Sequence, residues 1–423
     1  MNRPNLAAAL LGATLIGGLS LALSIPTPAQ AASKPTVTRA FARPLKSAQD
    51  DLKKGKYHEA LQQLDKARAL PKPSPYDTHV INELALYAYV KTKDFKDAAK
   101  AMEATLDDGF ITPNVKQERI RDLAGLYYQM KDYHQAAKFG EQAVKGGFGN
   151  ANMDTLVSQA YYLQGDYKNT MRFTHDLVDR EIHAGHTPKE SQMQIVLDSC
   201  VKLNNKSCIN EALARLVTYY PKPSYWQDIM DSLYQSKQAE RSDLDMLNIY
   251  RLSDDVGAMS QPAQYIEMAQ LALEQGSPGD AEQVLEKGYG KNVFTDPHVR
   301  QHADRLLANA KRQAKLDQRS LPKLAAEAQT SATGEKDVAV GVAYLGYQQY
   351  DKAVQALSQG LMKGSVHHAA EAQLLLGVAQ LKAGQKAAAI KSFKAVTGNP
   401  TMMQLAKLWS LRAHSASGTV AAR

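Results

Sequence analysis

Two histidine pairs are the residues in this sequence with the spacing of metal ligands. His298 and His302 lie four positions apart, with Asp304 close behind them. On a helix this spacing places both imidazoles on one face, where a third ligand would complete a zinc site. His183 and His186 form the second pair, in a predicted loop. Neither pair has the glutamate placement of a zinc protease, so we predict exposed histidines, with a zinc-dependent hydrolase as an alternative.

The sequence has no glycine-rich phosphate-binding loop and no Gly-x-Ser-x-Gly nucleophile motif. We therefore predict a non-enzymatic protein with no catalytic residue, no metal and no cofactor.

The helices that would position these side chains are indicated by a short sequence motif that recurs along the chain, which we call the phrase. It consists of a polar or glycine-containing turn, an aromatic residue, two variable positions and then a small residue. The copies pair Tyr57 with Ala60, Phe95 with Ala98, Tyr133 with Ala136, Tyr167 with Thr170, and Tyr350 with Ala353. The first four copies are 38, 38 and 34 residues apart. Such a period is typical of stacked helical hairpins, which bury their apolar faces only against their neighbours.

Each copy predicts two helices that pack closely. Apolar residues at helical spacing would fill the seam, and small residues such as Ala124, Gly341 and Gly377 would let two helices approach. Residues 222–257 and 297–330 lack the phrase, but we still expect helical hairpins there. Prolines fall at the expected breaks, namely Pro71 to Pro75, Pro113, Pro188, Pro221, Pro223, Pro297 and Pro400. The sequence thus predicts an all-α fold of about nine to ten hairpins between residues 45 and 415.

The phrase resembles the tetratricopeptide repeat, most closely around Tyr133, Tyr350 and Gly377. The resemblance implies a right-handed superhelical solenoid whose first helices line a groove for extended or helical peptides. It implies that the groove positions are Glu83, Tyr87, Arg121, Gly125, Tyr128, Gln159 and Tyr162. Of these, Glu83, Tyr87, Arg121, Tyr128, Gln159 and Tyr162 are our candidate residues for binding a peptide or partner. The alternative is that the tyrosines pack between hairpins.

The C-terminal copies differ because their groove positions are apolar. These positions hold Val338, Val342, Leu374 and Val378. Either the last helix, with Leu405 and Trp409, covers this end as a cap, or an apolar partner does. Terminal repeats need a polar outer face for solubility, which favours the cap.

Cys200 and Cys208 are the only cysteines in the chain. The repeat phase places Cys200 late in the first helix of the fifth hairpin and Cys208 early in the second. Antiparallel helices joined by a short turn bring such positions within disulfide reach. In an oxidising compartment we therefore predict a disulfide bond, with two buried thiols as the alternative.

The N-terminus has the layout of an export signal. A basic start at Arg3 leads into an apolar run over residues 6–25, and Ala29-Gln-Ala31 supplies the small residues of a cleavage site. We expect cleavage after Ala31 or one residue later, which predicts a periplasmic protein. The alternative is an uncleaved signal that anchors the chain in the inner membrane. No later segment is apolar enough to span a membrane.

The charge balance of the chain is mildly basic. Lysine and arginine number 51 and acidic residues 43, a net charge of +8 spread along the chain. We interpret this as a solvated surface, with mild attraction to anionic lipid headgroups, lipopolysaccharide or acidic partners as the functional alternative. The basic residues are not concentrated, so we expect no nucleic-acid partner. The sequence carries no signal for the oligomeric state.

Residues 220–226 and 265–276 are similar to exported proteobacterial tetratricopeptide proteins described as components of the TonB system. This resemblance implies a non-enzymatic periplasmic scaffold that binds a peptide segment or protein partner of a cell-envelope complex. An accessory subunit for assembly or export of outer-membrane proteins, pili or polysaccharide is the alternative. We expect a signal peptide (1–31), a linker (32–44), an N-terminal array (45–220), divergent hairpins with one repeat-like unit near 262–290 (221–330), a C-terminal pair with a capping helix (331–415) and a disordered tail (416–423).

Overall fold

The computed structural model describes residues 35–235 and 241–415. This part of the chain folds into 20 α-helices in repeated pairs and contains no strand, which confirms the predicted all-α repeat fold. The expected signal segment and C-terminal tail lie outside the described residues. The chain divides into two compact units, residues Met1–Asn205 and Lys206–Arg423, which we describe separately as unit 1 and unit 2.

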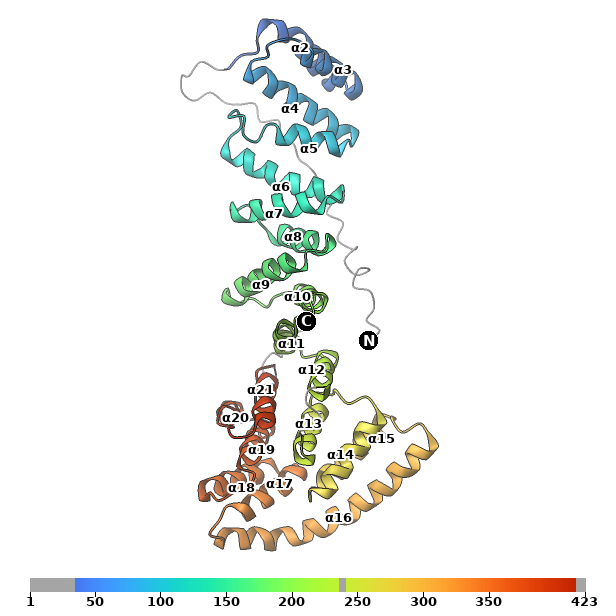
Figure 1. Cartoon of the computed structure of the whole chain (residues 1–423), viewed down its shortest axis with the longest axis vertical. Helices are drawn as coiled ribbons and strands as arrows, with labels where there is room; N and C mark the ends of the chain where they lie inside the picture. Colours follow the sequence, from blue (N-terminus) through green and yellow to red (C-terminus); the bar gives the residue numbers. More distant parts are fainter. Residues whose placement is uncertain (1–34, 236–240, 416–423) are drawn as a thin grey trace. The chain divides into compact units, whose positions relative to one another are not determined.

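Unit 1 is a stack of helix pairs (Figure 1). Its helices are α2 (Arg39–Lys53), α3 (Tyr57–Arg68), α4 (Pro75–Thr92), α5 (Phe95–Glu103), α6 (Pro113–Gln129), α7 (Tyr133–Lys145), α8 (Ala151–Leu163), α9 (Tyr167–His183) and α10 (Glu190–Lys202). Each even-numbered helix from α2 to α8 packs against the next helix in the chain, and that second helix packs against the following pair. Helix α2 begins within the segment that we expected to be a linker.

The recurring phrase marks the start of each second helix. Tyr57, Phe95, Tyr133 and Tyr167 are the first residues of α3, α5, α7 and α9. In three of these helices an aspartate precedes the aromatic residue, and its side chain accepts a hydrogen bond from the backbone N–H three residues later, as in Asp132 with Gln135 at 3.2 Å. Such a cap satisfies one of the free N–H groups at a helix start. The phrase is therefore an N-terminal cap signal.

The small residue of the phrase lies in the seam between helices. Ala60, Ala98, Ala136, Thr170 and Ala353 are all fully buried. A residue with a positive φ angle precedes each cap by one position, for example Lys131 at 61° and Gly165 at 81°. The left-handed residue turns the chain, the cap starts the helix, and the small residue lets that helix approach its partner.

Unit 2 is also built of α-helices, but their lengths and pairing are less regular than in unit 1. Its helices are α11 (Lys206–Tyr219), α12 (Pro223–Gln235), α13 (Asp243–Asp255), α14 (Pro262–Glu274), α15 (Pro278–Gly290), α16 (Pro297–Thr330), α17 (Glu335–Gly346), α18 (Tyr350–Lys363), α19 (Ala369–Lys382), α20 (Lys386–Lys394) and α21 (Pro400–Ser415). The prolines at 75, 113, 223, 297 and 400 each begin a helix, where the missing N–H costs nothing.

Residues 297–330 correct one expectation, because they form a single 34-residue helix and not a hairpin. The buried residues of α16 are Ala303, Ala310, Ala314, Leu321 and Ala328, which keep one face in contact with α14, α15 and α17. Their spacing follows one helical face without interruption, and no glycine breaks it. Pro322 lies inside the helix without ending it.

The last helix closes unit 2 on itself (Figure 1). Helix α21 packs against its neighbours α19 and α20 and also against α11 and α13. Trp409 is 2% exposed and stacks on Phe393 with ring centroids 6.3 Å apart. Leu374 and Val378, which the sequence showed as apolar groove positions, are buried.

Gly377 gives a test of this close packing. A Cβ atom added there would lie 2.4 Å from Cε1 of Phe393, which is itself held by Trp409. We expect Gly377→Ala to lower the free energy of unfolding by about 1–3 kcal/mol, because the ring must move. Gly125→Ala is the matched control, since a Cβ there meets nothing within 4 Å. That control should raise stability by about 0.5–1 kcal/mol, and thermal unfolding that ranks the two variants the other way would contradict the packing.

Candidate functional site

Polar side chains connect the first helices of successive pairs in unit 1. Arg119 of α6 forms an ion pair with Glu83 of α4, with Nη1–Oε1 and Nη2–Oε2 distances of 2.6 and 2.7 Å. Tyr128 of α6 donates its hydroxyl hydrogen to Oε1 of Gln159 in α8 at 2.9 Å. These contacts tie each first helix to the first helix of the next pair.

Tyr162 extends the series to α10. Its hydroxyl donates to Oδ2 of Asp198 at 2.6 Å. Burial raises the pKa of Tyr162, and the hydrogen bond to Asp198 raises it further, so the hydroxyl stays protonated and can donate at neutral pH. Burial likewise raises the pKa of Tyr128.

The tyrosines of the first helices also contact the aromatic residue that starts the second helix. The rings meet edge to face, with centroid distances of 6.3 Å for Tyr87 and Tyr57, 5.6 Å for Tyr128 and Tyr133, and 5.6 Å for Tyr162 and Tyr167. Aromatic pairs prefer this geometry. Each ring is therefore fixed in place while part of it remains exposed.

Three residues of α6 form an open surface that we call the α6 patch: Arg121, Gly125 and Tyr128. They lie four and then three positions apart and so share one helix face. The Arg121 side chain is 42% exposed, and within the described residues its ion-pair partner is Asp122, at 3.5 Å. Nothing lies within 4 Å of a Cβ built on Gly125. The patch offers guanidinium donors, open space and a ring edge.

The predicted binding residues thus lie together on α4, α6 and α8. Tyr87, Arg121, Tyr128 and Tyr162 are half-buried, and Gln159 is buried at 8% exposure. The two alternatives for the tyrosines are compatible, because these side chains pack between hairpins and still reach the surface. That a partner binds them stays a prediction.

Sequence reasoning missed the partners Arg119 and Asp198. Each lies 36 residues after the group it pairs with, which is close to one repeat period. Opposite charges or donor–acceptor pairs at that separation on equivalent helix faces would have been the signal. Because its carboxylate is already ion-paired with Arg119, Glu83 is less available to a binding partner than its sequence position suggested.

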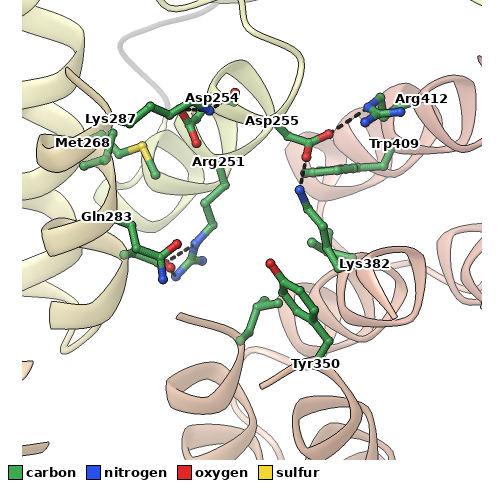
Figure 2. A pocket seen from close by; sticks show the side chains of 14 residues that line it. Arg251, Asp254, Asp255, Met268, Gln283, Lys287, Tyr350, Lys382, Trp409 and Arg412 are labelled. Atoms are coloured by element: carbon green, nitrogen blue, oxygen red, sulfur yellow. Dashed lines mark hydrogen bonds and ion pairs between the residues drawn. The ribbon is translucent and has the colours of Figure 1, made fainter. Parts of the chain in front are cut away.

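Unit 2 contains a pocket that the sequence did not indicate (Figure 2). It encloses ≈ 340 Å³ and is lined by residues of α13, α14, α15, α17, α18, α19 and α21. Arg251 pairs with Asp280 at 2.8 Å and with Glu371 at 3.4 Å. Lys287 pairs with Asp254 at 2.7 Å. The charges of the lining are thus largely satisfied by one another, and Met268, Val378 and Trp409 supply apolar surface.

One carboxylate in this pocket connects α13 with the last helices of unit 2. Asp255 of α13 has a side chain only 6% exposed, and it accepts from Nε of Arg412 in α21 at 2.9 Å. It also pairs with Lys382 of α19. A buried carboxylate between two cations is compensated in charge, and it adds an electrostatic contact to the apolar packing of α21.

The histidine pairs do not assemble a metal site. Within residues 35–235 and 241–415, no group of three His, Cys, Asp or Glu side chains is placed to hold a metal ion. Nε2 of His302 lies 3.4 Å from Nε2 of Gln270. Asp304 accepts from the hydroxyl of Tyr289, and Nδ1 of His183 lies 2.8 Å from the carbonyl oxygen of Asp179. In the same part of the chain, no helix combines the length and hydropathy needed to cross a bilayer.

One protein-family model matches part of the chain. Residues 341–401 match the tetratricopeptide repeat family, in the region of the phrase copies at Tyr350 and Gly377. No curated protein matches the chain.

Several solved structures are similar. A tetratricopeptide repeat protein from Parabacteroides merdae is 12% identical, covering 78% of this chain and 98% of that one, with a TM-score of 0.26. PilF of Pseudomonas aeruginosa is 14% identical, covering 46% and 97%, with a TM-score of 0.23. Yeast Tom70 is 10% identical, covering 89% and 96%, with a TM-score of 0.24.

The predicted disulfide is present. Cys200 is near the end of α10, Cys208 is near the start of α11, and both are disulfide-bonded. No described cysteine is free. The repeat phase was sufficient to find this bond because it located both cysteines relative to one turn.

This bond gives a second prediction. The native protein should take up no iodoacetamide before reduction and two alkyl groups after it, as measured by intact mass. Replacing both cysteines by serine should lower the free energy of unfolding by about 2–3 kcal/mol, since a short loop is no longer closed in the unfolded chain. Wild-type protein alkylated in denaturant without reductant is the control, and two alkyl groups there would disprove the bond.

Proposed function

We propose that this protein is an exported, non-enzymatic scaffold that holds a segment of a partner protein against the first helices of unit 1. The observation that carries the proposal is the α6 patch, where exposed guanidinium donors, an open surface at Gly125 and a partly exposed Tyr128 ring lie on one helix face. Helical repeats of the tetratricopeptide type generally act as interaction scaffolds, which agrees with this use.

The chemistry of the patch suits a polypeptide segment. The guanidinium of Arg121 can donate to backbone carbonyls or to a carboxylate of an extended chain. The ring of Tyr128 contributes contact area with little loss of rotamer freedom. Its hydroxyl is already held by Gln159, so the ring is oriented before a partner arrives. Such preorganisation lowers the entropic cost of binding.

The setting that we propose is the cell envelope. The apolar N-terminal segment with its small-residue exit supports export, and a disulfide is compatible with an oxidising compartment. The similarity of residues 220–226 and 265–276 to exported proteins of the TonB system favours a partner in TonB-linked outer-membrane transport.

The α6 patch can be tested by photo-crosslinking in the native host. A photoreactive side chain at position 125 of the full-length protein should give a discrete adduct with one partner, because this position faces open space. The same group at His134, an exposed residue of α7, is the matched control and should not give that adduct. Arg121→Ala should reduce adduct yield at least several-fold, since hot-spot side chains contribute about 2 kcal/mol or more.

A second variant protects this test from effects of misfolding. Gly125→Trp fills the patch and removes a glycine from a helix interior, so it should not lower thermal stability, and it should reduce recovery of the partner. If partner recovery is unaffected by both Gly125→Trp and Arg121→Ala, the α6 patch is not the binding surface.

Export is tested by the mass and location of the mature chain. We expect the protein in the periplasmic fraction, with an intact mass that begins at Ala32 or Ser33. A membrane-bound chain that keeps residues 1–31 would instead support the uncleaved anchor. A cytoplasmic chain of full length would contradict export.

A further inference from the structure

The 34-residue helix α16 carries an excess of basic residues. It contains seven basic residues and three acidic ones, a net charge of +4. The net charge of the whole chain is +8, and α16 is one of the segments that supply its basic excess. A local excess of this size creates a field that a solvated, mixed-charge surface does not.

Five of the seven basic residues lie on the side of α16 that faces away from the other helices of unit 2. We call this the outer α16 face, and its exposed cations are Arg305, Arg312, Lys315, Arg319 and Lys323. Arg305, Arg312 and Arg319 are seven residues apart, a spacing that returns to nearly the same side of a helix. The opposite side carries the buried alanines and Leu321, which contact α14, α15 and α17.

The cations of this face are weakly neutralised. Lys323 approaches Glu327 at 4.0 Å with a side chain that is 83% exposed. Arg312 donates to the neutral Asn309 at 2.8 Å. Among the residues that the structure describes, Arg305, Lys315 and Arg319 form no ion pair. The charge is available to an external anion.

One exposed leucine accompanies the cations. Leu316 is 60% exposed and lies beside Lys315, between Arg312 and Arg319 on the same side of the helix. A single exposed leucine is ordinary on a protein surface. Within a row of cations on one helix, however, it matches the combination that favours a membrane interface, where cations meet headgroups and apolar side chains enter the acyl boundary.

We propose that the outer α16 face docks on the surface of an anionic phospholipid bilayer. The cations of this face span residues 305–323, about 27 Å along the helix. A row of this length can meet several phosphates of a bilayer surface. An acidic protein would satisfy the charges, but only a bilayer offers an apolar layer to Leu316 directly beneath the anions. A second copy of this chain would be repelled by the same charge. The proposal is independent of the partner site in unit 1.

Vesicle co-sedimentation of the full mature protein tests the proposal. Vesicles of phosphatidylethanolamine and phosphatidylglycerol at 3:1 should bind the protein at low ionic strength and release it at 0.5 M NaCl, where surface charges are screened. Phosphatidylcholine vesicles should not bind it. The triple variant Arg312→Glu, Lys315→Glu, Arg319→Glu should lower the partition coefficient by about a hundred-fold, because each cation near an anionic surface contributes roughly five-fold.

The matched control changes the net charge equally at another place. Lys53→Glu, Lys54→Glu and Lys56→Glu alter three exposed lysines of unit 1, and this variant should keep most of the vesicle binding. Equal loss in both triple variants would show a response to net charge alone and would overturn the assignment to α16. Failure of the wild-type protein to bind the anionic vesicles would also overturn it.

A fluorescent reporter tests the orientation. Trp226 and Trp409 are 1% and 2% exposed, so tryptophan introduced by Leu316→Trp would be the main solvent-sensitive emitter. Its emission should shift to shorter wavelength when anionic vesicles are added. Binding without such a shift, or a soluble polyglutamate that binds more tightly than the vesicles at the same salt, would overturn bilayer docking. The second result would identify an acidic polypeptide as the partner.

Discussion

The start of each second helix in unit 1 depends on a local constraint of three adjacent positions. A left-handed residue reverses the chain, an aspartate or other cap residue ends the turn, and an aromatic residue begins the new helix, as in Lys131, Asp132 and Tyr133. The backbone N–H groups of a helix start must be satisfied, so the cap fixes where the helix begins. Because that point is fixed, the small residue three positions after the aromatic residue, such as Ala136, lies in the seam at the same register in each copy. The pairs can therefore stack.

Close packing then divides the side chains between structure and surface. At the seam, small residues are required, and Gly377 packed against Phe393 is an example. On the first helices of unit 1, the larger polar residues bridge neighbouring pairs, as Tyr162 does with Asp198. These bridges leave only part of each side chain exposed. A residue such as Tyr128 therefore contributes both to the stack and to the proposed partner surface.

The sequence predicted those features that repeat. The phrase located the second helices, the buried small residues and the disulfide, because each depends on positions within one hairpin. It could not predict the continuous helix α16, since residues 297–330 lack the phrase and the choice between a hairpin and one long helix is made by contacts with α14, α15 and α17. The sequence could not predict the ion pairs of Arg251 with Asp280 and Glu371 either. A repeat motif does not indicate which side chains meet when they come from helices that lack the motif. The sequence alone also could not show that five cations of residues 297–330 share one exposed face, because this depends on the segment forming a single helix.

The closure of unit 2 by α21 has a consequence for how this part of the chain folds. In an open stack each hairpin touches only its neighbours, so ends can fray or assemble independently. Asp255 instead meets Lys382 and Arg412, partners 127 and 157 positions away in the chain. Contacts of such high sequence separation raise the contact order and slow folding. Together with the packing of α21 on α11 and α13, they couple the unfolding of the early helices of unit 2 to that of its last helix. Unit 2 should therefore unfold as one cooperative block. Truncation at its C-terminal end should destabilise α11 and α13.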